Sequence, residues 1–207
     1  MLRQSERTAA YRAALDQLEA MGLLYPCFCT RKDIADEIAR AGAAPHGAEG
    51  LLYPGICRDL PEDVRRERIE SGIPYARRLN AAKAAALVGP LGFLEHDETV
   101  AVDPVLLGDV VLARKEMPAA YHLAVVVDDA YQGVSLVTRG NDLFAATHVQ
   151  RLLQALLDLP VPAYAHHKLI LDEAGRKFSK RDAAVTLREL RAKGETPVTI
   201  RARLGLG

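Results

Sequence analysis

Residues 163–186 read AYAHHKLILDEAGRKFSKRDAAVT, and the rest of the chain is organised around this stretch. The apolar run Lys168–Leu171 predicts a short buried strand, and the Asp-Glu-Ala-Gly sequence after it contains the residues of a tight turn. Four cations then fall within six residues, and a helical pattern follows them. A basic loop between a strand and a helix start can bind several negative charges at once. We therefore expect Lys177, Ser179 and Lys180 to contact a polyphosphate, unless the loop is simply a solvated surface.

The composition is that of an ordinary globular protein. The chain has 207 residues, of which 49% are hydrophobic and 26% are charged, and Lys+Arg and Asp+Glu both number 27. Bulk charge therefore does not attract polyanions, and any nucleic-acid contact must come from local patches such as Arg65-Arg66-Arg68, unless these are simply solvated helix faces. No apolar run approaches the roughly 20 residues of a membrane span, so we expect a cytoplasmic protein with no membrane partner.

The first 22 residues predict an amphipathic helix. Tyr11, Leu15 and Leu18 fall at helical spacing with charges between them, and Gly22 is placed to end the helix.

Three cysteines lie close together in the sequence. Cys27 and Cys29 are one residue apart in an extended segment, and Cys57 follows a Pro-Gly turn. An odd number of cysteines in one region favours a metal site over a disulfide framework, and tetrahedral zinc prefers thiolates. The common set of three cysteines and one histidine nominates His46 as the fourth ligand. The alternative without a metal is three reduced cysteines packed as small apolar groups.

The second half of the chain predicts several strands. Residues 109–115 and 134–138 each read as one strand, and the run 119–129 reads as the longest. Because the β-branched residues of this run do not alternate with polar ones, we expect a strand covered on both faces, as in a parallel sheet. The pattern predicts an α/β fold.

A strand–helix–strand crossover follows. A helix from 141 or 142 to 157 joins the strand before Arg139 to a strand at 163–171. In open α/β sheets, ligands lie beyond the carboxyl ends of the strands, where we expect both Arg139 and the 177–181 loop. Arg139 can hold a carboxylate in bidentate fashion, and Tyr121 can donate a phenolic hydrogen bond and form a wall of the pocket.

The chain resembles the glutamyl branch of the class I aminoacyl-tRNA synthetases. The loop Lys177-Phe178-Ser179-Lys180-Arg181 is similar to their lysine-serine-lysine signature, and His167–Asp172 looks like the strand that leads into it. Residues 3–7 and Tyr11 resemble the helix that precedes the cysteine pair in that branch. The resemblance covers nearly the whole chain and implies a Rossmann-like nucleotide-binding core.

The resemblance also implies roles for single residues. Lys180 would bind ATP and act as the principal catalytic cation, with Lys177 and Ser179 in support and Mg²⁺ sharing the charge. Tyr121 and Arg139 would bind the glutamate substrate.

The family pattern of Cys-x-Cys followed by Tyr-x-x-x-Cys points to Tyr53 rather than His46 as the fourth zinc ligand. We therefore expect one structural zinc per chain, held by the side chains of Cys27, Cys29, Tyr53 and Cys57. The implied organisation is a helix of the core at 1–20, an inserted zinc-binding α+β subdomain that resembles an acceptor-end-binding domain at 21–108, and the C-terminal half of the core at 109–207.

The resemblance implies ATP-dependent activation of glutamate as glutamyl-adenylate. Because the chain ends soon after Arg181, it is most similar to the branch without an anticodon domain, which transfers glutamate to the queuosine base of tRNA(Asp). The histidine-rich adenine-binding signature has no match, so we expect an N-terminally incomplete fragment that is inactive alone. We also expect a monomer. The alternatives are a truncated ordinary glutamyl-tRNA synthetase and a non-catalytic, zinc-stabilised RNA-binding module.

Overall fold

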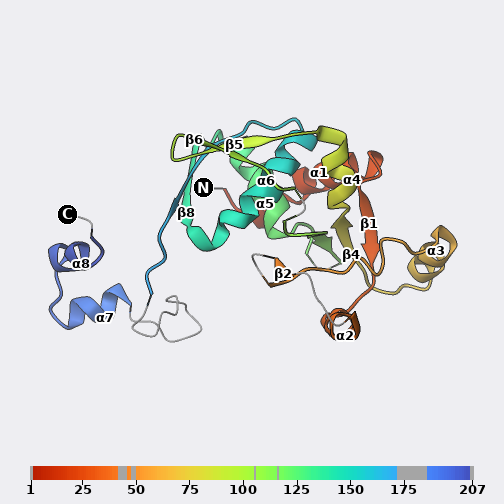
Figure 1. Cartoon of the computed structure of the whole chain (residues 1–207), viewed down its shortest axis with the longest axis horizontal. Coiled ribbons are helices and arrows are strands. Elements are labelled where there is room, and N and C mark those ends of the chain that lie inside the picture. Colours follow the sequence, from red (N-terminus) through yellow and green to blue (C-terminus); the bar gives the residue numbers. More distant parts are fainter. Residues whose placement is uncertain are drawn as a thin grey trace. The chain divides into compact units, whose positions relative to one another are not determined.

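The computed structural model describes residues 2–41, 46–47, 50–104, 106–115, 117–171 and 186–205, with backbone alone at 38, 40, 41, 46, 47, 50 and 51. The chain forms two compact units (Figure 1). The first comprises residues 1–139 and 143–166, and the second comprises residues 140–142 and 167–207. The domain boundaries predicted from the sequence, at 20/21 and 108/109, stay predictions.

The N-terminal helix forms as predicted, with shorter bounds. A 3-10 turn, η1 (Gln4–Glu6), precedes α1 (Thr8–Ala20). Tyr11, Leu15 and Leu18 are buried on one face of α1. Gly22 adopts a φ of +66°, a left-handed conformation that ends the helix at little steric cost.

A three-stranded antiparallel sheet follows the helix. Its order is β1-β4-β7, formed by β1 (Leu24–Cys27), β4 (Ala76–Leu79) and β7 (Val111–Arg114). Leu24 lies opposite Leu79, and Arg77 lies opposite Ala113. The predicted strand at 109–115 is therefore confirmed as β7.

Shorter elements connect these strands. They are α2 (Arg31–Ala41), β2 (His46–Gly47), β3 (Gly50–Leu51), α3 (Glu62–Glu70) and α4 (Ala81–Val88).

The second sheet has four strands in the order β6-β5-β9-β8. These are β6 (Glu98–Ala101), β5 (Gly92–Glu95), β9 (Ala163–His167) and β8 (Leu136–Gly140). β5 pairs antiparallel with β6 and parallel with β9, so the sheet is mixed rather than purely parallel. The Ala163 N–H donates to Ser135 O (2.9 Å), which brings together the starts of β8 and β9. The carboxyl ends of β8 and β9 therefore lie together at the other end of these strands.

The strand predicted at 119–129 is wrong: this run forms the helix α5 (Tyr121–Gln132). Leu123 and Val126 are buried on the side that packs against α1 and against α6 (Phe144–Leu156). Gly133 ends the helix in the left-handed conformation, with a φ of +64°. The β preference of three consecutive valines is weak, and burial of a helical face between two other helices outweighs it.

The predicted strand–helix–strand crossover is confirmed, although the last strand is shorter than predicted. β8 leads through the 3-10 turn η2 (Asn141–Leu143) into α6, and β9 follows. β9 ends at His167, and the expected buried strand at 168–171 is wrong because Ile170 and Leu171 are 51% and 52% exposed.

One hydrophobic core joins α1, α4, α5, α6 and the first sheet. Its fully buried members include Leu18, Leu79, Leu112, Leu123, Leu152 and Leu153.

The second unit contains α7 (Leu187–Ala192) and α8 (Pro197–Arg203). Each begins with a capping box, set by Thr186 with Glu189 and by Thr196 with Thr199. Within the described ranges, no helix is both long enough and apolar enough to cross a bilayer.

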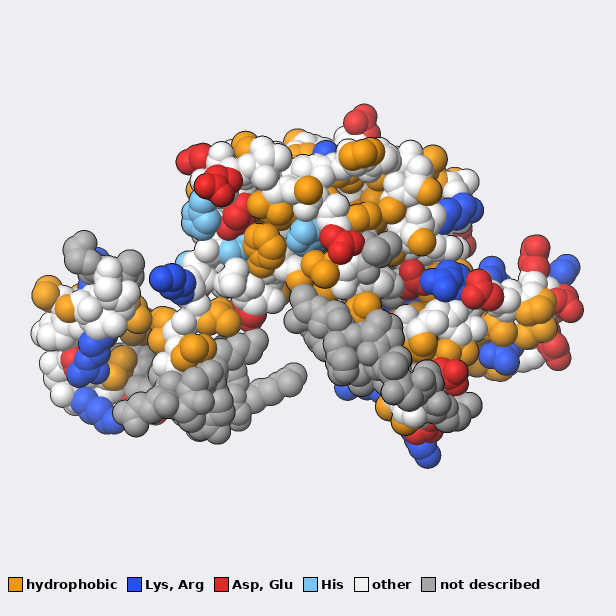
Figure 2. Space-filling view, viewed as in Figure 1, with side chains coloured by type: hydrophobic (Ala, Val, Ile, Leu, Met, Phe, Trp, Pro, Cys, Tyr) orange, Lys and Arg blue, Asp and Glu red, His pale blue; other side chains and the backbone are white. Residues whose placement is uncertain are grey.

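Acidic and basic side chains alternate over α3. Figure 2 shows both signs side by side there, because Arg65, Arg66 and Arg68 are interleaved with Glu62, Asp63, Glu67 and Glu70. The predicted basic patch at 65–68 is thus balanced in charge along its own helix.

Candidate active site

The guanidinium of Arg139 is fixed near the carboxyl end of β8. Its Nε donates to His166 Nε2 (3.0 Å), its Nη2 donates to Thr147 Oγ1 (2.7 Å), and its Nη1 donates to Tyr121 OH (3.1 Å). Tyr121 and Arg139, which the sequence nominated together, therefore do lie in contact. The contact does not test their expected role in substrate binding, which stays a prediction.

Thr147 and His166 were not predicted from the sequence. Thr147 is fully buried in α6, and His166 is 7% exposed in β9. Each is polar in a segment that reads as apolar core, and such a buried polar residue is the signal that could have identified them. Their partner, Arg139, lies 8 and 27 residues away in sequence, and only the fold shows the contact.

Tyr121 is the first residue of α5 and is 44% exposed, so it is not a core aromatic residue. It lines a cleft of about 430 Å³ together with His122, Tyr53 and Arg78. Nδ1 of His122 is buried without a hydrogen-bond partner among the described residues. Burial, and secondarily the charge of Arg139, lower the pKa of His122 to about 4, so its ring is neutral near pH 7.

The three cysteines gather at the end of β1. Their Sγ atoms all lie within 4.8 Å of one another. The Tyr53 hydroxyl is 3.3 Å from Cys27 Sγ and 3.7 Å from Cys29 Sγ, and Cys29 Sγ is 3.4 Å from Cys57 Sγ. The four side chains nominated for a metal are thus neighbours, whereas the side chain of His46 lies outside the described part of the chain.

This geometry fits a tetrahedral ion. With metal–sulfur bonds of about 2.3 Å and a metal–oxygen bond of about 2.0 Å, the edges of a tetrahedron are about 3.8 Å between sulfurs and about 3.5 Å from sulfur to oxygen. The contacts that join Cys29 and Tyr53 to the rest of the cluster, at 3.3 to 3.7 Å, are close to those lengths. The cluster can therefore hold a metal ion.

The surroundings of the three thiols differ. The Phe28 N–H donates to Cys57 Sγ (3.4 Å). Burial raises the pKa of the Cys29 thiol to about 12. For Cys27, burial also acts to raise the pKa, but hydrogen bonds with Tyr53 and Arg78 outweigh it and lower the pKa. A bound cation would favour the ionised form of all three thiols.

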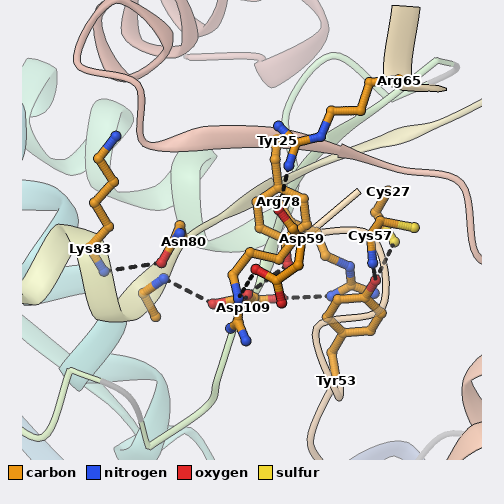
Figure 3. A network of polar contacts seen from close by, with 12 residues as sticks. Tyr25, Cys27, Tyr53, Cys57, Asp59, Arg65, Arg78, Asn80, Lys83 and Asp109 are labelled. Atoms are coloured by element: carbon orange, nitrogen blue, oxygen red, sulfur yellow. Dashed lines mark hydrogen bonds and ion pairs between the residues drawn. The ribbon is translucent and has the colours of Figure 1, made fainter. Parts of the chain in front are cut away.

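Asp109 joins the cysteine cluster to the core (Figure 3). Its carboxylate, 4% exposed, accepts from Tyr25 OH (2.6 Å), from the Ala81 N–H (2.9 Å) and from Arg58 Nη1 (3.1 Å). Its carbonyl oxygen accepts from Arg78 Nη1 (2.6 Å). Burial, together with the neighbouring carboxylate, raises the pKa of Tyr25, so Tyr25 stays a neutral donor.

Arg78 and Arg58 connect Asp109 to the cysteine cluster. The Arg78 guanidinium stacks 3.8 Å from the ring centroid of Tyr53, and Arg58 follows Cys57 directly. The orientation of the cysteine cluster is therefore tied to the first sheet through one buried carboxylate.

Lys177, Ser179 and Lys180, the residues nominated for ATP binding and catalysis, lie outside the described residues. Their roles stay predictions.

Comparison with known proteins identifies the class of protein. The family described as "tRNA synthetases class I (E and Q), catalytic domain" matches residues 1–206. The chain therefore belongs to this family, as its lysine loop and cysteine region predicted.

The chain is similar to several proteins of this family that are named glutamyl-Q tRNA(Asp) synthetase. The one from Rhodobacter capsulatus is 46% identical over 213 residues, which cover 100% of this chain and 75% of the relative. The one from Nocardia farcinica is 45% identical, covering 97% of this chain and 61% of the relative. The chain thus spans three quarters of the first relative and about three fifths of the second.

Solved structures agree with this family. The glutamate-tRNA synthetase of Elizabethkingia anophelis matches with a TM-score of 0.69 and 26% identity, over 87% of this chain and 37% of that protein. A glutamate tRNA ligase from Elizabethkingia meningosepticum, solved in complex with its amino acid, matches with a TM-score of 0.67 and 26% identity, over 87% and 36%.

Proposed function

We propose that this protein activates glutamate with ATP to form glutamyl-adenylate and transfers the glutamyl group to the queuosine base of tRNA(Asp). The observation that carries the proposal is the fixed guanidinium of Arg139 beside the hydroxyl of Tyr121. The names of the relatives support both the amino acid and the RNA.

The donor count at Arg139 explains why a carboxylate is the expected ligand. A guanidinium has five N–H groups. Contacts among the described residues use the single one on Nε and one on each Nη, which leaves one on Nη1 and one on Nη2. Two N–H groups on adjacent terminal nitrogens match the two oxygens of a carboxylate.

This carboxylate is the side-chain carboxylate of glutamate, because the α-carboxylate must stay open to react. An α-carboxylate oxygen attacks the α-phosphorus of ATP, a new C–O–P bond forms, and the bond to the β-phosphate breaks to release pyrophosphate. A hydroxyl of the modified base then attacks the activated carbonyl, and AMP leaves.

The charge that develops on the phosphates needs cations, and we assign this task to Lys180, with Lys177 and Ser179 in support and with the Mg²⁺ that accompanies ATP. Losing one such donor typically costs about 3 kcal/mol of transition-state stabilisation.

We further propose that one structural zinc ion binds Cys27, Cys29, Tyr53 and Cys57. The sulfur and oxygen spacings support four-coordinate binding, and zinc prefers sulfur ligands. Metal analysis of protein purified without a chelator should find about one zinc per chain, and a much lower content would contradict this assignment.

The test of the amino-acid site is calorimetric titration with L-glutamate. Arg139→Gln should weaken binding roughly a hundredfold, since two charge-assisted hydrogen bonds are lost. Arg66→Gln, on the exposed face of α3, is the matched control and should bind normally. Equal affinity of the Arg139→Gln variant and the unchanged protein would refute the assignment.

The test of the RNA step is glutamyl transfer by the protein to tRNA(Asp) with and without queuosine. Product should require the modified base. Equal product on tRNA(Glu) would instead indicate an ordinary glutamyl-tRNA synthetase, the second candidate, which the Elizabethkingia structures favour.

A further inference from the structure

We propose that Glu95 and His166 form a positioning pair that fixes the orientation of Arg139 and thereby sets the affinity for a carboxylate substrate. The inference rests on the proposed function of Arg139. Glu95 ends β5, and His166 and Arg139 lie one residue before the ends of β9 and β8, so neighbouring strands bring all three to the same edge of one sheet.

The hydrogen bonds fix the position of the proton on His166. An arginine stays protonated, so its Nε can only donate, and His166 Nε2 must accept this bond (3.0 Å). The ring proton is then on Nδ1, which lies 2.8 Å from Glu95 Oε2. The other carboxylate oxygen of Glu95 accepts the backbone N–H of His166 (2.8 Å). Glu95 therefore stabilises the tautomer in which the unprotonated nitrogen, Nε2, faces Arg139.

The pair also decides which edge of the guanidinium remains for a ligand. Nε and Nη2 share one edge of the planar group, and His166 and Thr147 occupy both positions. His166 Nε2 and Thr147 Oγ1 are themselves 3.4 Å apart. Within the described part of the chain, one N–H on Nη1 and one N–H on Nη2 are left without a partner, next to Tyr121 OH.

Burial makes this arrangement rigid. The side chain of His166 is 1% exposed and that of Glu95 is 12% exposed. His166 is also enclosed by rings, since Phe144 meets it edge-on with centroids 5.3 Å apart and Tyr164 stacks on it at 6.1 Å. The charge on Glu95 is favoured: burial acts to raise its pKa, but the two hydrogen bonds from His166 outweigh this and lower it. A binding group held by a locked second layer of residues loses little freedom when its ligand arrives.

The decisive substitution is Glu95→Gln, which keeps the shape and removes the charge. Its amide can donate to Nδ1, so the ring proton moves to Nε2, where it opposes the Nε–H of Arg139. The matched control is Glu98→Gln, on the exposed strand that pairs with β5, directly opposite Glu95.

The experiment combines ¹⁵N NMR of the histidine rings with titration of L-glutamate into the whole chain. The unchanged protein and Glu98→Gln should show His166 protonated on Nδ1 and equal glutamate affinity. Glu95→Gln should show the proton on Nε2 and bind glutamate at least tenfold more weakly. His166→Gln, which can keep an acceptor near Arg139, should bind glutamate more tightly than His166→Phe.

Two results would overturn the inference: an Nε2–H tautomer in the unchanged protein, or unchanged glutamate affinity in Glu95→Gln once its ring proton has moved. Failure of the proposed function would give a different result. Arg139→Gln would then bind glutamate normally, while the NMR spectra would still show His166 protonated on Nδ1 in the unchanged protein.

Discussion

Replacing Asp109 with alanine should destabilise the protein by about 2–6 kcal/mol. The carboxylate is 4% exposed and serves two buried donors, Tyr25 OH at 2.6 Å and the Ala81 N–H at 2.9 Å. Each donor left without a partner costs about 1–3 kcal/mol, and the two together give the range above. The third donor, Arg58, has a side chain that is 37% exposed, and water can replace its lost partner, so it adds little.

Urea unfolding followed by circular dichroism measures this loss as a change in ΔG at zero denaturant with an unchanged slope. Asp109→Asn should fall between alanine and the unchanged protein, because its one oxygen can accept but its NH₂ group opposes the second donor. Asp59→Ala is the control: its side chain is 81% exposed, and we expect a change below about 0.5 kcal/mol. A loss below about 1 kcal/mol for Asp109→Ala would refute the view that this carboxylate holds the junction.

Three further predictions concern other parts of the molecule. Asp128 accepts from Tyr11 OH (2.7 Å) and from Arg7 Nε (2.6 Å), so Asp128→Asn should lower the free energy of unfolding measured with urea, by about 1 kcal/mol for the Tyr11 hydroxyl alone; an unchanged free energy of unfolding would contradict this. The pKa of His122 is lowered from 6.5 to about 4 by burial, so the unfolded chain binds the proton more readily between these values. Stability should therefore fall as pH drops from 6.5 to 4, by up to roughly 3 kcal/mol, and a His122→Gln variant should lack this part of the pH dependence in thermal melts. Removing the proposed zinc ion with a chelator should lower the melting temperature by about 5 °C or more, and re-addition of zinc should restore it.

Local patterns predicted α1, α6, β7, β8 and β9, because the signals lie within a few residues of the structure they predict. The spacing of Tyr11, Leu15 and Leu18 predicted α1, and the Pro-Gly turn before Cys57 predicted that the third thiol would meet the first two. α5 was misread as a strand because β-branched residues were weighed above the left-handed stop at Gly133. A run that ends in such a glycine, twelve residues after its start, is also typical of a helix.

The residues of the candidate site divide in the same way. Tyr121 and Arg139 were identified because they resemble residues of a known pattern. Glu95 and His166, 71 positions apart, were not, because nothing near either residue indicates its partner. Only the order of strands in the second sheet brings them together, and that order follows from the packing of the whole unit.

The sheet β1-β4-β7 has a consequence for how the chain folds as it is made. β1 leaves the ribosome before β4, its partner among the described strands of this sheet, which begins at Ala76, and β7 must follow before β4 has both of its neighbours. Until residue 114 has emerged, the side of β4 that pairs with β7 has no partner strand and can join other chains. We therefore expect nascent chains stalled before β7 to be protease-sensitive, and those stalled well beyond it to be resistant.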